Sequence, residues 1–318
     1  MTNRTRLLLW TDGAGPYVAA IEAAGLADRV AVETLPRTQQ PSDAQKAETE
    51  ALLAWGAPAG LLPAMKRLRW AQAMTAGVES WLALPDVPAA LTLTCARGTH
   101  RESMPENILG GLFSITKPYA AVAEDQKQSK WTRRLAIPLA GQTLGILGLG
   151  AVGQDLARMA QAIGMRVIGT KRTAAAIPGV EVLPPERTDE VFRQADFLVL
   201  LLPATPQTES FVDAERLALM KPTAWLLNFG RGHLIDDAAL IAAAANMKIA
   251  GAILDVFRQE PLPASHPFWQ AKGIHVLPHI GGGHPRRDSV VARLFVENLG
   301  RFLDGKPLRE VVDRAAGY

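Results

Sequence analysis

The stretch Thr143-Leu144-Gly145-Ile146-Leu147-Gly148-Leu149-Gly150-Ala151-Val152-Gly153 decides the fold of this 318-residue chain. An apolar run leads into a G-x-G-x-x-G turn, and apolar residues then recur at helical spacing from position 156 to position 163. Gly148 would permit a tight turn, Gly150 would let a pyrophosphate approach the backbone, and Gly153 would let the helix pack closely on the strand. Free N–H groups at the start of the helix favour the same ligand. This context predicts dinucleotide binding rather than a glycine-rich turn without a ligand, with contacts at Gly148, Gly150, Ala151, Val152 and Gly153.

The residues after the next expected strand indicate which dinucleotide binds. The strand Met165–Thr170 ends at Lys171-Arg172-Thr173, where an acidic residue would normally bind the ribose 2′-hydroxyl. Two cations and a hydroxyl can instead bind a 2′-phosphate, because a guanidinium offers phosphate several donors in one plane. We therefore expect NADP(H) to be preferred over NAD(H). The alternative is that Lys171 and Arg172 form only a solvated pair of loop residues.

Composition and charge are those of an ordinary globular protein, with 48% hydrophobic and 20% charged residues. The formal net charge is +3 and no long basic run is present, so no nucleic-acid partner is expected. Cys95 is the only cysteine, which excludes an intrachain disulfide and a zinc site built from several cysteines, and no metal site is predicted. The apolar run at Leu7–Trp10 is too short for a signal-peptide core, and no window approaches the ~18 apolar residues that span a bilayer. We expect a cytoplasmic protein without a membrane partner.

Strand-like and helical patterns alternate along the whole chain, which predicts parallel, doubly wound sheets. The turn at Gly148 opens a second α/β unit, because a complete set of alternating elements precedes it. Besides the strands that flank the turn, strands are expected at 6–10, 30–35, 51–55, 68–74, 91–96, 195–202, 224–228, 249–254 and 274–277, and helices at 17–24, 214–220 and 236–245.

The predicted fold class is α/β, with a Rossmann-like cofactor domain inserted into a flavodoxin-like substrate domain. After His279 a glycine-rich segment precedes an amphipathic helix with apolar residues from Val290 to Phe302, and this helix has no nucleotide-binding strand left to cover. We expect it to return to the first domain. The substrate domain would then comprise residues 1–98 and 284–318, and the NAD(P)-binding domain residues 99–283. The polar stretch Arg37–Gln45 is expected to be a loop.

Three polar segments follow strands of the second unit, where strand ends face the ligand crevice. They are Asn228-Phe229-Gly230-Arg231-Gly232, Asp255-Val256-Phe257-Arg258-Gln259-Glu260-Pro261-Leu262 and Pro278-His279-Ile280-Gly281. An arginine, an acid and a histidine could converge there. Structural alternatives remain for each residue: a buried ion pair for Arg231, an extended residue before proline for Glu260, and a hydrogen-bonded structural imidazole for His279.

These segments resemble the D-isomer-specific 2-hydroxyacid dehydrogenase family, whose patterns N-x-x-R-G, D-V-F-x-x-E-P-L and P-H-I-G they match. The resemblance covers almost the entire chain. The loop Met74–Glu79 is similar to the family's carboxylate-binding A-G-V-[DE] loop. The segments Pro178–Glu181 and Val312–Tyr318 resemble the family's bacterial glyoxylate/hydroxypyruvate reductase A branch.

The resemblance implies a role for each candidate residue. Arg231 would bind the substrate carboxylate and polarise the 2-oxo oxygen, His279 would be the general acid in reduction, and Glu260 would favour its imidazolium form. Asp255 would hold the nicotinamide carboxamide. Trp55 would cover the substrate, although packing at the domain edge is an equal alternative. The remaining implied contacts are Ala76, Gly77 and Val78 for the substrate, and Leu202, Pro203, Thr208, Phe229, Gly230 and Gly281 for the cofactor.

The resemblance also bears on assembly and on substrate. Trp131 lies in the segment by which relatives form a homodimer, so a homodimer is expected, with packing inside the subunit as the alternative. The chain departs from the family at Gly282-Gly283-His284, which brings a second imidazole near His279, and at Arg101–Asn107, which opens the long connecting helix. The expected reaction is reduction of a small 2-oxo acid, glyoxylate or hydroxypyruvate, by NADPH. Alternatives are an NAD-linked dehydrogenase of a larger, phosphoglycerate-like acid and a nucleotide-sensing scaffold.

Overall fold

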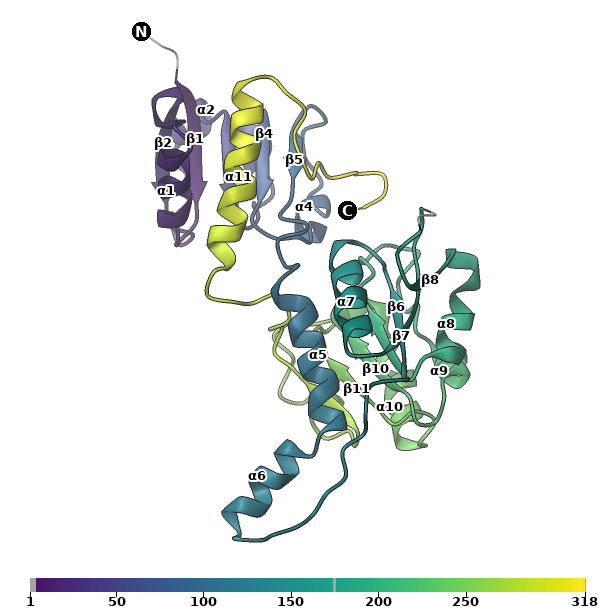
Figure 1. Ribbon diagram of the computed structural model, residues 1–318. Helices are drawn as coiled ribbons and strands as arrows, with labels where there is room; N and C mark the ends of the chain where they lie inside the picture. The colour runs from purple at the N-terminus through teal and green to yellow at the C-terminus, as the bar shows by residue number, and fades with distance from the viewer. Residues whose placement is uncertain (1–3, 174–175, 318) are drawn as a thin grey trace. The chain divides into compact units, whose positions relative to one another are not determined.

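The computed structural model describes residues 4–173 and 176–317. The chain forms two compact units (Figure 1). One comprises Met1–Thr99 together with His284–Tyr318, and the other comprises His100–Gly283. The chain therefore crosses between the units twice, and the second unit is an insertion in the first.

The first unit contains a five-stranded parallel sheet in the order β2-β1-β3-β4-β5. Strand β1 is hydrogen-bonded to β2 on one side and to β3 on the other, with Leu8 opposite Glu33 and Leu52. The strand order reverses between β1 and β3, which creates a topological switch point at their carboxyl ends. The strands are β1 (Thr5–Trp10), β2 (Val30–Leu35), β3 (Ala51–Ala54), β4 (Trp70–Ala73) and β5 (Thr92–Thr94).

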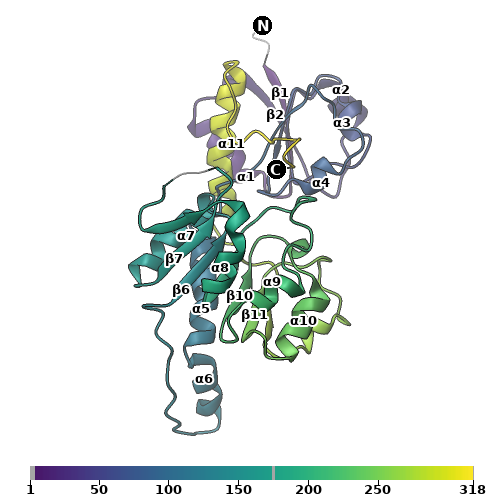
Figure 2. The same cartoon turned by 90° about the vertical axis from the view of Figure 1, so that its right-hand side faces the viewer.

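Helices cover both faces of this sheet. Helices α1 (Gly15–Ala23) and α11 (Arg287–Leu303) pack together over one face, where the Phe295 ring stacks on Trp70 with a centroid distance of 5.4 Å. The other face is covered by the shorter helices α2 (Asp43–Glu48), α3 (Leu61–Ala64) and α4 (Glu79–Leu82), as Figure 2 shows.

One expected loop is partly helical. The sequence predicts a loop over residues 37–45, whereas α2 begins at Asp43. Ser42 caps this helix: its hydroxyl accepts the backbone N–H of Gln45, and the Gln45 side chain accepts the N–H of Ser42. A capping box can define a short polar helix that has no apolar periodicity.

The second unit contains a seven-stranded parallel sheet in the order β12-β11-β10-β9-β6-β7-β8. Its switch point lies between β6 and β9. The strands are β6 (Thr143–Leu147), β7 (Arg166–Thr170), β8 (Val180–Leu183), β9 (Phe197–Leu200), β10 (Trp225–Asn228), β11 (Gly251–Leu254) and β12 (Ile274–Val276). The sequence did not predict the edge strand β8, and several other strands are one or two residues shorter at an end than predicted.

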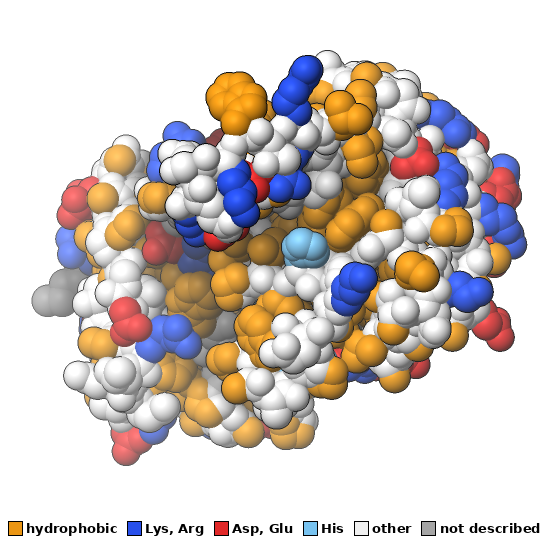
Figure 3. Space-filling view, turned by 90° about the horizontal axis from the view of Figure 1, so that it is seen from below, with side chains coloured by type: hydrophobic (Ala, Val, Ile, Leu, Met, Phe, Trp, Pro, Cys, Tyr) orange, Lys and Arg blue, Asp and Glu red, His pale blue; other side chains and the backbone are white. Residues whose placement is uncertain are grey.

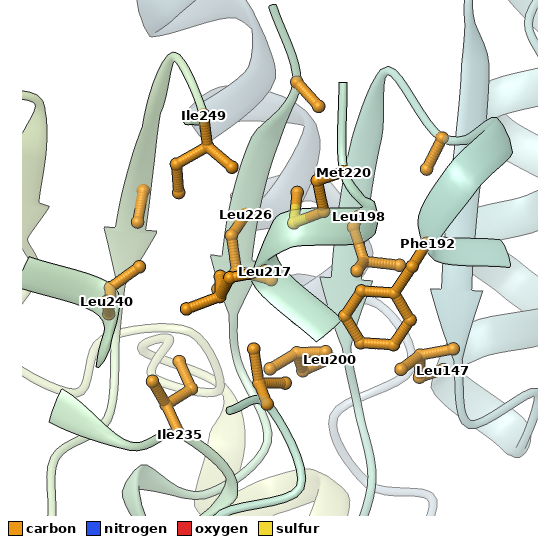
Figure 4. Close-up of a cluster of buried hydrophobic side chains, with 14 of the residues drawn as sticks. Leu147, Phe192, Leu198, Leu200, Leu217, Met220, Leu226, Ile235, Leu240 and Ile249 are labelled. Atoms are coloured by element: carbon orange, nitrogen blue, oxygen red, sulfur yellow. The ribbon is translucent and has the colours of Figure 1, made fainter. Parts of the chain in front are cut away.

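Alternating residues of the central strands face two separate cores. On β9, Leu198 and Leu200 join the cluster in Figure 4, which packs against Phe192 and Leu217. Their neighbour Val199 joins the cluster on the opposite face. Helices α8 (Thr188–Gln194), α9 (Ala214–Leu219) and α10 (Asp237–Ala245) cover the first face, and α5 (Ser103–Thr116) and α7 (Ala151–Ala162) cover the second.

The remaining elements are short or lie away from the sheets. Helix α6 (Tyr119–Lys127) continues beyond α5 and extends away from the sheet of its unit (Figure 1). The 3-10 turns are η1 (Ala27–Arg29), η2 (Pro185–Arg187), η3 (Gly232–Leu234) and η4 (Pro267–Trp269). Across residues 4–173 and 176–317, no helix combines the length and the apolar character that crossing a membrane requires. The predicted fold class of two parallel α/β sheets is confirmed.

Candidate active site

The glycine turn after β6 has the backbone geometry that its sequence predicts. Gly148 has a φ of +108°, and a Cβ built on it would lie 2.9 Å from the Leu201 carbonyl oxygen. A Cβ on Gly153 would lie 2.4 Å from the Gly148 carbonyl oxygen, so this glycine lets α7 pack directly on the turn. A Cβ on Gly150 would meet no described atom within 4 Å. The turn is therefore packed tightly against protein atoms at Gly148 and Gly153, and a ligand could approach it at Gly150.

The start of α7 fits an anionic ligand at this open side. Gly150 is the N-cap residue, no side chain caps the helix, and its first turn holds no acidic residue. The first N–H groups of a helix lack partners within the helix, and the helix dipole adds partial positive charge there. Ala151, Val152 and Gly153 thus present their N–H groups where the pyrophosphate of a dinucleotide would lie.

The residues that would bind the adenosine ribose follow β7. Lys171 donates its backbone N–H to the Leu183 carbonyl of the adjacent strand β8 at 3.2 Å, which fixes the point where the chain leaves the sheet. Arg172 and Thr173 are exposed. No acidic residue stands in this segment, and the nearby Glu181 of β8 is paired with Arg166 at 2.6 Å.

The loop after β9 is held together by hydrogen bonds of the Thr208 hydroxyl to the backbone of the same loop. The Thr208 hydroxyl donates to the Pro203 carbonyl at 2.7 Å and accepts the Thr205 N–H at 2.8 Å. Leu202 lies beside the next loop, since a Cβ on Gly230 would come within 2.8 Å of the Leu202 carbonyl oxygen. The expected cofactor residues Leu202, Pro203, Thr208 and Gly230 thus belong to two adjoining loops at the carboxyl edge of the sheet.

A buried asparagine shapes the loop that carries Arg231. Asn228 is the last residue of β10 and is fully buried. Its carboxamide donates to the Arg231 carbonyl at 2.9 Å and accepts the Gly230 N–H at 3.1 Å. The Arg231 guanidinium donates to the Gly230 carbonyl at 2.7 Å. The turn and the Arg231 guanidinium are therefore held by hydrogen bonds.

The Arg231 loop lies directly against the loop that follows β11. A Cβ on Gly232 would lie 1.9 Å from the Phe257 carbonyl carbon, so only glycine fits this position without displacing the backbone. Arg258 joins the two loops from the other side: its guanidinium donates to the Ile235 carbonyl at 2.5 Å and to the Ser210 hydroxyl at 2.8 Å. The sequence analysis did not predict that Arg258 joins these loops. Only its position between the candidate residues Asp255 and Glu260 could have drawn attention to it.

Glu260 and His279 form a direct pair. His279 has a φ of +53°, and its Nδ1 lies 2.6 Å from the Glu260 Oε2. The other carboxylate oxygen, Oε1, accepts the Phe257 N–H at 2.8 Å. The carboxylate is thus anchored to its own loop and orients the imidazole through Nδ1. The second ring nitrogen, Nε2, is then the atom that can face a ligand.

Asp255 lies beneath this pair and is almost completely buried. Its two oxygens accept the backbone N–H groups of Ile280 at 2.7 Å and of Gly281 at 2.9 Å. Burial raises the pKa of the Asp255 carboxyl, and these two hydrogen bonds oppose the rise. A Cβ on Gly281 would meet the Asp255 carboxylate at 2.6 Å and the Phe229 ring at 2.7 Å. Asp255 and Phe229 therefore fix the segment that follows His279.

The expected substrate residues belong to the first unit. Ala76, Gly77 and Val78 form a loop between β4 and α4, in which the Thr75 hydroxyl donates to the Gly77 carbonyl at 2.6 Å. Trp55 follows β3, and its carbonyl accepts the Trp81 indole N–H at 3.2 Å. Within residues 4–173 and 176–317, no cluster of three or more His, Cys, Asp or Glu side chains could hold a metal ion.

Comparison with known proteins identifies the family. The family model of the D-isomer specific 2-hydroxyacid dehydrogenase, NAD binding domain matches residues 109–281. A D-isomer specific 2-hydroxyacid dehydrogenase family protein from Aeromonas salmonicida has a TM-score of 0.88 and 33% identity, over 98% of this chain and 100% of that one. The chain belongs to the D-isomer specific 2-hydroxyacid dehydrogenases, and its second unit holds their NAD-binding domain.

Two further relatives carry more specific names. The NADPH-dependent glyoxylate/hydroxypyruvate reductase of Sinorhizobium meliloti, solved with NADP and sulfate, has a TM-score of 0.85 and 27% identity, over 99% of this chain and 100% of that one. A glyoxylate reductase of Thermococcus onnurineus is 38% identical over 178 residues, which are 55% of this chain and 52% of that enzyme. The match thus spans about half the length of the Thermococcus enzyme.

Proposed function

We propose that this dehydrogenase reduces a small 2-oxo acid, glyoxylate or hydroxypyruvate, to the 2-hydroxy acid with NADPH. The observation that carries the proposal is the 2.6 Å contact between His279 and Glu260, at the strand ends that also carry Arg231. Strands β10, β11 and β12 are neighbours in the sheet and are all parallel. The segments that bear Arg231, Glu260 and His279 therefore leave the sheet at the same edge.

Each of these side chains has a distinct task in the reaction. The nicotinamide, when bound, supplies the hydride. Arg231 binds the substrate carboxylate and polarises the 2-oxo oxygen through its planar donors. His279 donates a proton from Nε2 to that oxygen, and Glu260 holds the imidazole at Nδ1. The loop Ala76–Val78 offers backbone N–H groups to the carboxylate.

We further propose that NADP(H) is preferred over NAD(H). Lys171 and Arg172 stand where an acidic residue would otherwise bind a ribose 2′-hydroxyl. Such an acidic residue would repel a 2′-phosphate, whereas the two cations can bind it. The exchange Lys171→Asp with Arg172→Ala is expected to raise KM for NADPH at least tenfold, with a smaller effect on KM for NADH. The exchange Arg193→Ala, on α8 of the same unit, removes one cation elsewhere and is the matched control. An unchanged NADPH preference in the double variant would contradict the assignment.

The rival substrate class, a phosphoglycerate-like acid, would need a phosphate site in the first unit. The candidate cations are Lys66, Arg67 and Arg69, and all three precede β4, at the amino-terminal end of that strand. Arg67 is paired with Glu50 at 2.9 Å, and the Arg69 guanidinium lies 4.8 Å from the centre of the Phe302 ring. None of the three lies at the carboxyl edge of the sheet, where ligands bind in open α/β folds.

The test is consumption of NADPH and of NADH with a panel of 2-oxo acids graded by size and charge. We expect turnover with NADPH and the smallest acids. Cofactor binding with negligible reduction of every acid would contradict the proposal and favour a nucleotide-sensing scaffold. Faster turnover of 3-phosphohydroxypyruvate with NADH would favour the rival substrate class.

We also propose that the chain forms a homodimer through the segment around α6. Tyr119, Val122, Trp131, Leu135 and Ile137 are all exposed there, Trp131 by 95% and Leu135 by 98%. Figure 3 shows hydrophobic side chains at the surface beside lysine and arginine side chains on the face seen from below. A single subunit gains nothing from exposing such side chains, whereas a second copy would bury them.

A further inference from the structure

The first unit contains a pocket of about 300 Å³ at the switch point of its own sheet. Trp10 is the last residue of β1, Trp55 directly follows β3, and Arg37 comes two residues after β2. In an open α/β sheet, ligands bind outside the carboxyl ends of the strands where the strand order reverses. The pocket is lined by Trp10, Arg37, Gln40, Trp55, Gly56, Ala57 and Pro58.

The loop that carries Arg37 is fixed on the strand ends. The Trp10 indole N–H is shared between the carbonyls of Pro36 at 3.2 Å and Gln39 at 2.9 Å. The backbone N–H of Arg37 donates to the Asp12 carboxylate at 2.9 Å. These bonds hold the backbone of the loop and leave the Arg37 side chain to extend over the pocket.

The Arg37 guanidinium lies over an aromatic ring rather than against an acid. Its central carbon is 5.3 Å from the centre of the Trp55 ring. Within the part of the chain that the structure describes, no carboxylate forms an ion pair with the Arg37 side chain. The stacked guanidinium keeps its in-plane N–H donors available for an anion, because the ring occupies only its face.

A second arginine links Trp55 to the proposed carboxylate loop. The Arg287 guanidinium lies 4.4 Å from the centre of the Trp55 ring and donates to the carbonyl of Met74, which precedes the loop Ala76–Val78. Its charge is balanced by Asp288, whose carboxylate it contacts at 2.5 Å. Arg287 therefore positions Trp55 beside that loop, and Arg37 supplies the unbalanced positive charge of the pocket.

We infer that this pocket receives the far end of 2-oxo acids that are longer than glyoxylate and that, among these longer acids, Arg37 favours those bearing a second carboxylate. The inference rests on the proposed function, because the first carboxylate is assigned there to the loop Ala76–Val78 of the same unit. A carboxylate at the far end would form charge-assisted hydrogen bonds with Arg37 in a pocket partly shielded by Trp10 and Trp55. An uncharged end of equal size would contact only the indole rings.

The experiment compares oxaloacetate with 4-methyl-2-oxopentanoate, in which a branched alkyl group of similar shape replaces the second carboxylate. The wild-type chain is expected to have a higher kcat/KM for oxaloacetate. Arg37→Gln is expected to lower the oxaloacetate value by about tenfold to a hundredfold, the range of a hydrogen bond to a charged group. The ratio of the two kcat/KM values would then fall.

Arg69→Gln is the matched control. It also removes a guanidinium stacked on a ring, but at the amino-terminal end of a strand in the same sheet. It should leave the ratio at its wild-type value.

Two results would overturn the inference: a wild-type preference for the uncharged acid, or an equal ratio in wild type and Arg37→Gln. If the chain reduces no 2-oxo acid, the proposed function fails and the pocket is judged by binding alone. Calorimetric titration of the 318-residue chain with malonate then tests whether the pocket binds a carboxylate. Binding that weakens at least tenfold in Arg37→Gln and persists in Arg69→Gln supports the anion site, and absent or equal binding in wild type and Arg37→Gln refutes it.

Discussion

At the scale of single residues, the proposed chemistry of the second unit depends on the two contacts that the Glu260 carboxylate makes. One accepts the Phe257 N–H and the other contacts the His279 imidazole. The first bond fixes the carboxylate, so the second can fix the ring. A glutamine has only one side-chain oxygen, so it could not accept hydrogen bonds from both the Phe257 N–H and the imidazole through separate oxygens.

His279→Asn is expected to lower kcat for reduction by about a hundredfold to ten-thousandfold, the usual effect of losing a general acid or base. In the wild type, kcat for reduction should fall as pH rises and the imidazolium loses its proton. That limb should disappear in His279→Asn. The measurement is kcat against pH with saturating NADPH.

His275→Asn is the matched control for this experiment. His275 lies on β12 four residues before His279, is exposed, and has its ring centroid 5.5 Å from that of Trp225. Its exchange should leave both the rate and the pH profile as in the wild type. A basic limb that persists in His279→Asn would assign the proton to another group. His284 would be the first to examine, because its Nε2 is buried and has no hydrogen-bond partner among the described residues.

Arg231→Ala is expected to raise KM for the 2-oxo acid and to lower kcat together, because in the proposed function the guanidinium binds both the carboxylate and the developing oxyanion. A combined loss of at least a hundredfold in kcat/KM corresponds to about 2.7 kcal/mol of transition-state stabilisation. Arg231→Lys should recover only part of it, since a single ammonium lacks the planar fork. Steady-state kinetics measures both parameters, and an unchanged kcat/KM would refute the assigned role.

At the scale of elements, the site depends on two loops that follow neighbouring strands and contact each other through their backbones. Gly232 places the Arg231 loop on Phe257, and Arg258 ties it to Ile235. This contact lies between residues that the sequence separates by more than twenty positions. The relative position of Arg231 and Glu260 within the second unit is thus set by close packing rather than by either loop alone.

Gly232→Ala is expected to separate these loops, because its Cβ would lie 1.9 Å from the Phe257 carbonyl carbon. A displacement near 1 Å can lower kcat/KM by roughly a hundredfold, and overpacking of this kind costs about 1–3 kcal/mol of stability. Gly110→Ala on α5 is the control, since a Cβ there meets no described atom within 4 Å. Kinetics well below the unfolding temperature, with thermal unfolding alongside, measures both effects. Wild-type kcat/KM in Gly232→Ala would show that the contact does not position the site.

The sequence predicts those elements whose residue types follow from local backbone geometry. The glycine turn is such a case, because the positive φ of Gly148 and the close contact at Gly153 leave little room for other residues. The order of strands and helices was also predictable, since buried parallel strands form apolar runs. The pairing of Glu260 with His279 remained only an expectation from the family's motifs until the structure placed the two side chains 2.6 Å apart.

The elements that sequence reasoning missed have physical reasons in common. Strand β8 is an edge strand with Glu181 exposed, so it lacks the apolar run that marks a buried strand. Helix α2 is polar, and its start is defined by the capping side chains of Ser42 and Gln45. The role of Arg258 arises from carbonyl and hydroxyl groups that only the tertiary fold brings to it. Contacts of this kind leave no periodic signal in the sequence.

At the scale of the whole molecule, each unit has a parallel sheet with a ligand edge of its own. The second sheet places Gly148–Gly153 at the β6/β9 switch point, and the first places Trp10 and Trp55 at the β1/β3 switch point. In both units the proposed ligand thus lies at the carboxyl ends of the strands where the strand order reverses. The proposals assign the cofactor and the far end of the substrate to separate sheets, so substitutions in the first unit are expected to change substrate preference without altering the dinucleotide site.

The exposed apolar side chains near α6 lead to a prediction about assembly. Trp131→Glu with Leu135→Glu is expected to convert a homodimer into a monomer, because burial of one large apolar side chain contributes roughly 1.5–3 kcal/mol and a two-fold interface counts each residue twice. Light scattering after size-exclusion chromatography measures the mass of the assembly, with the chain at a concentration of several micromolar. Met247→Glu is the control: Met247 is 78% exposed and lies outside this segment, so its exchange should leave the dimer intact. A wild-type chain with the mass of one subunit, or a double variant that still has the mass of two, would show that this surface is not the interface.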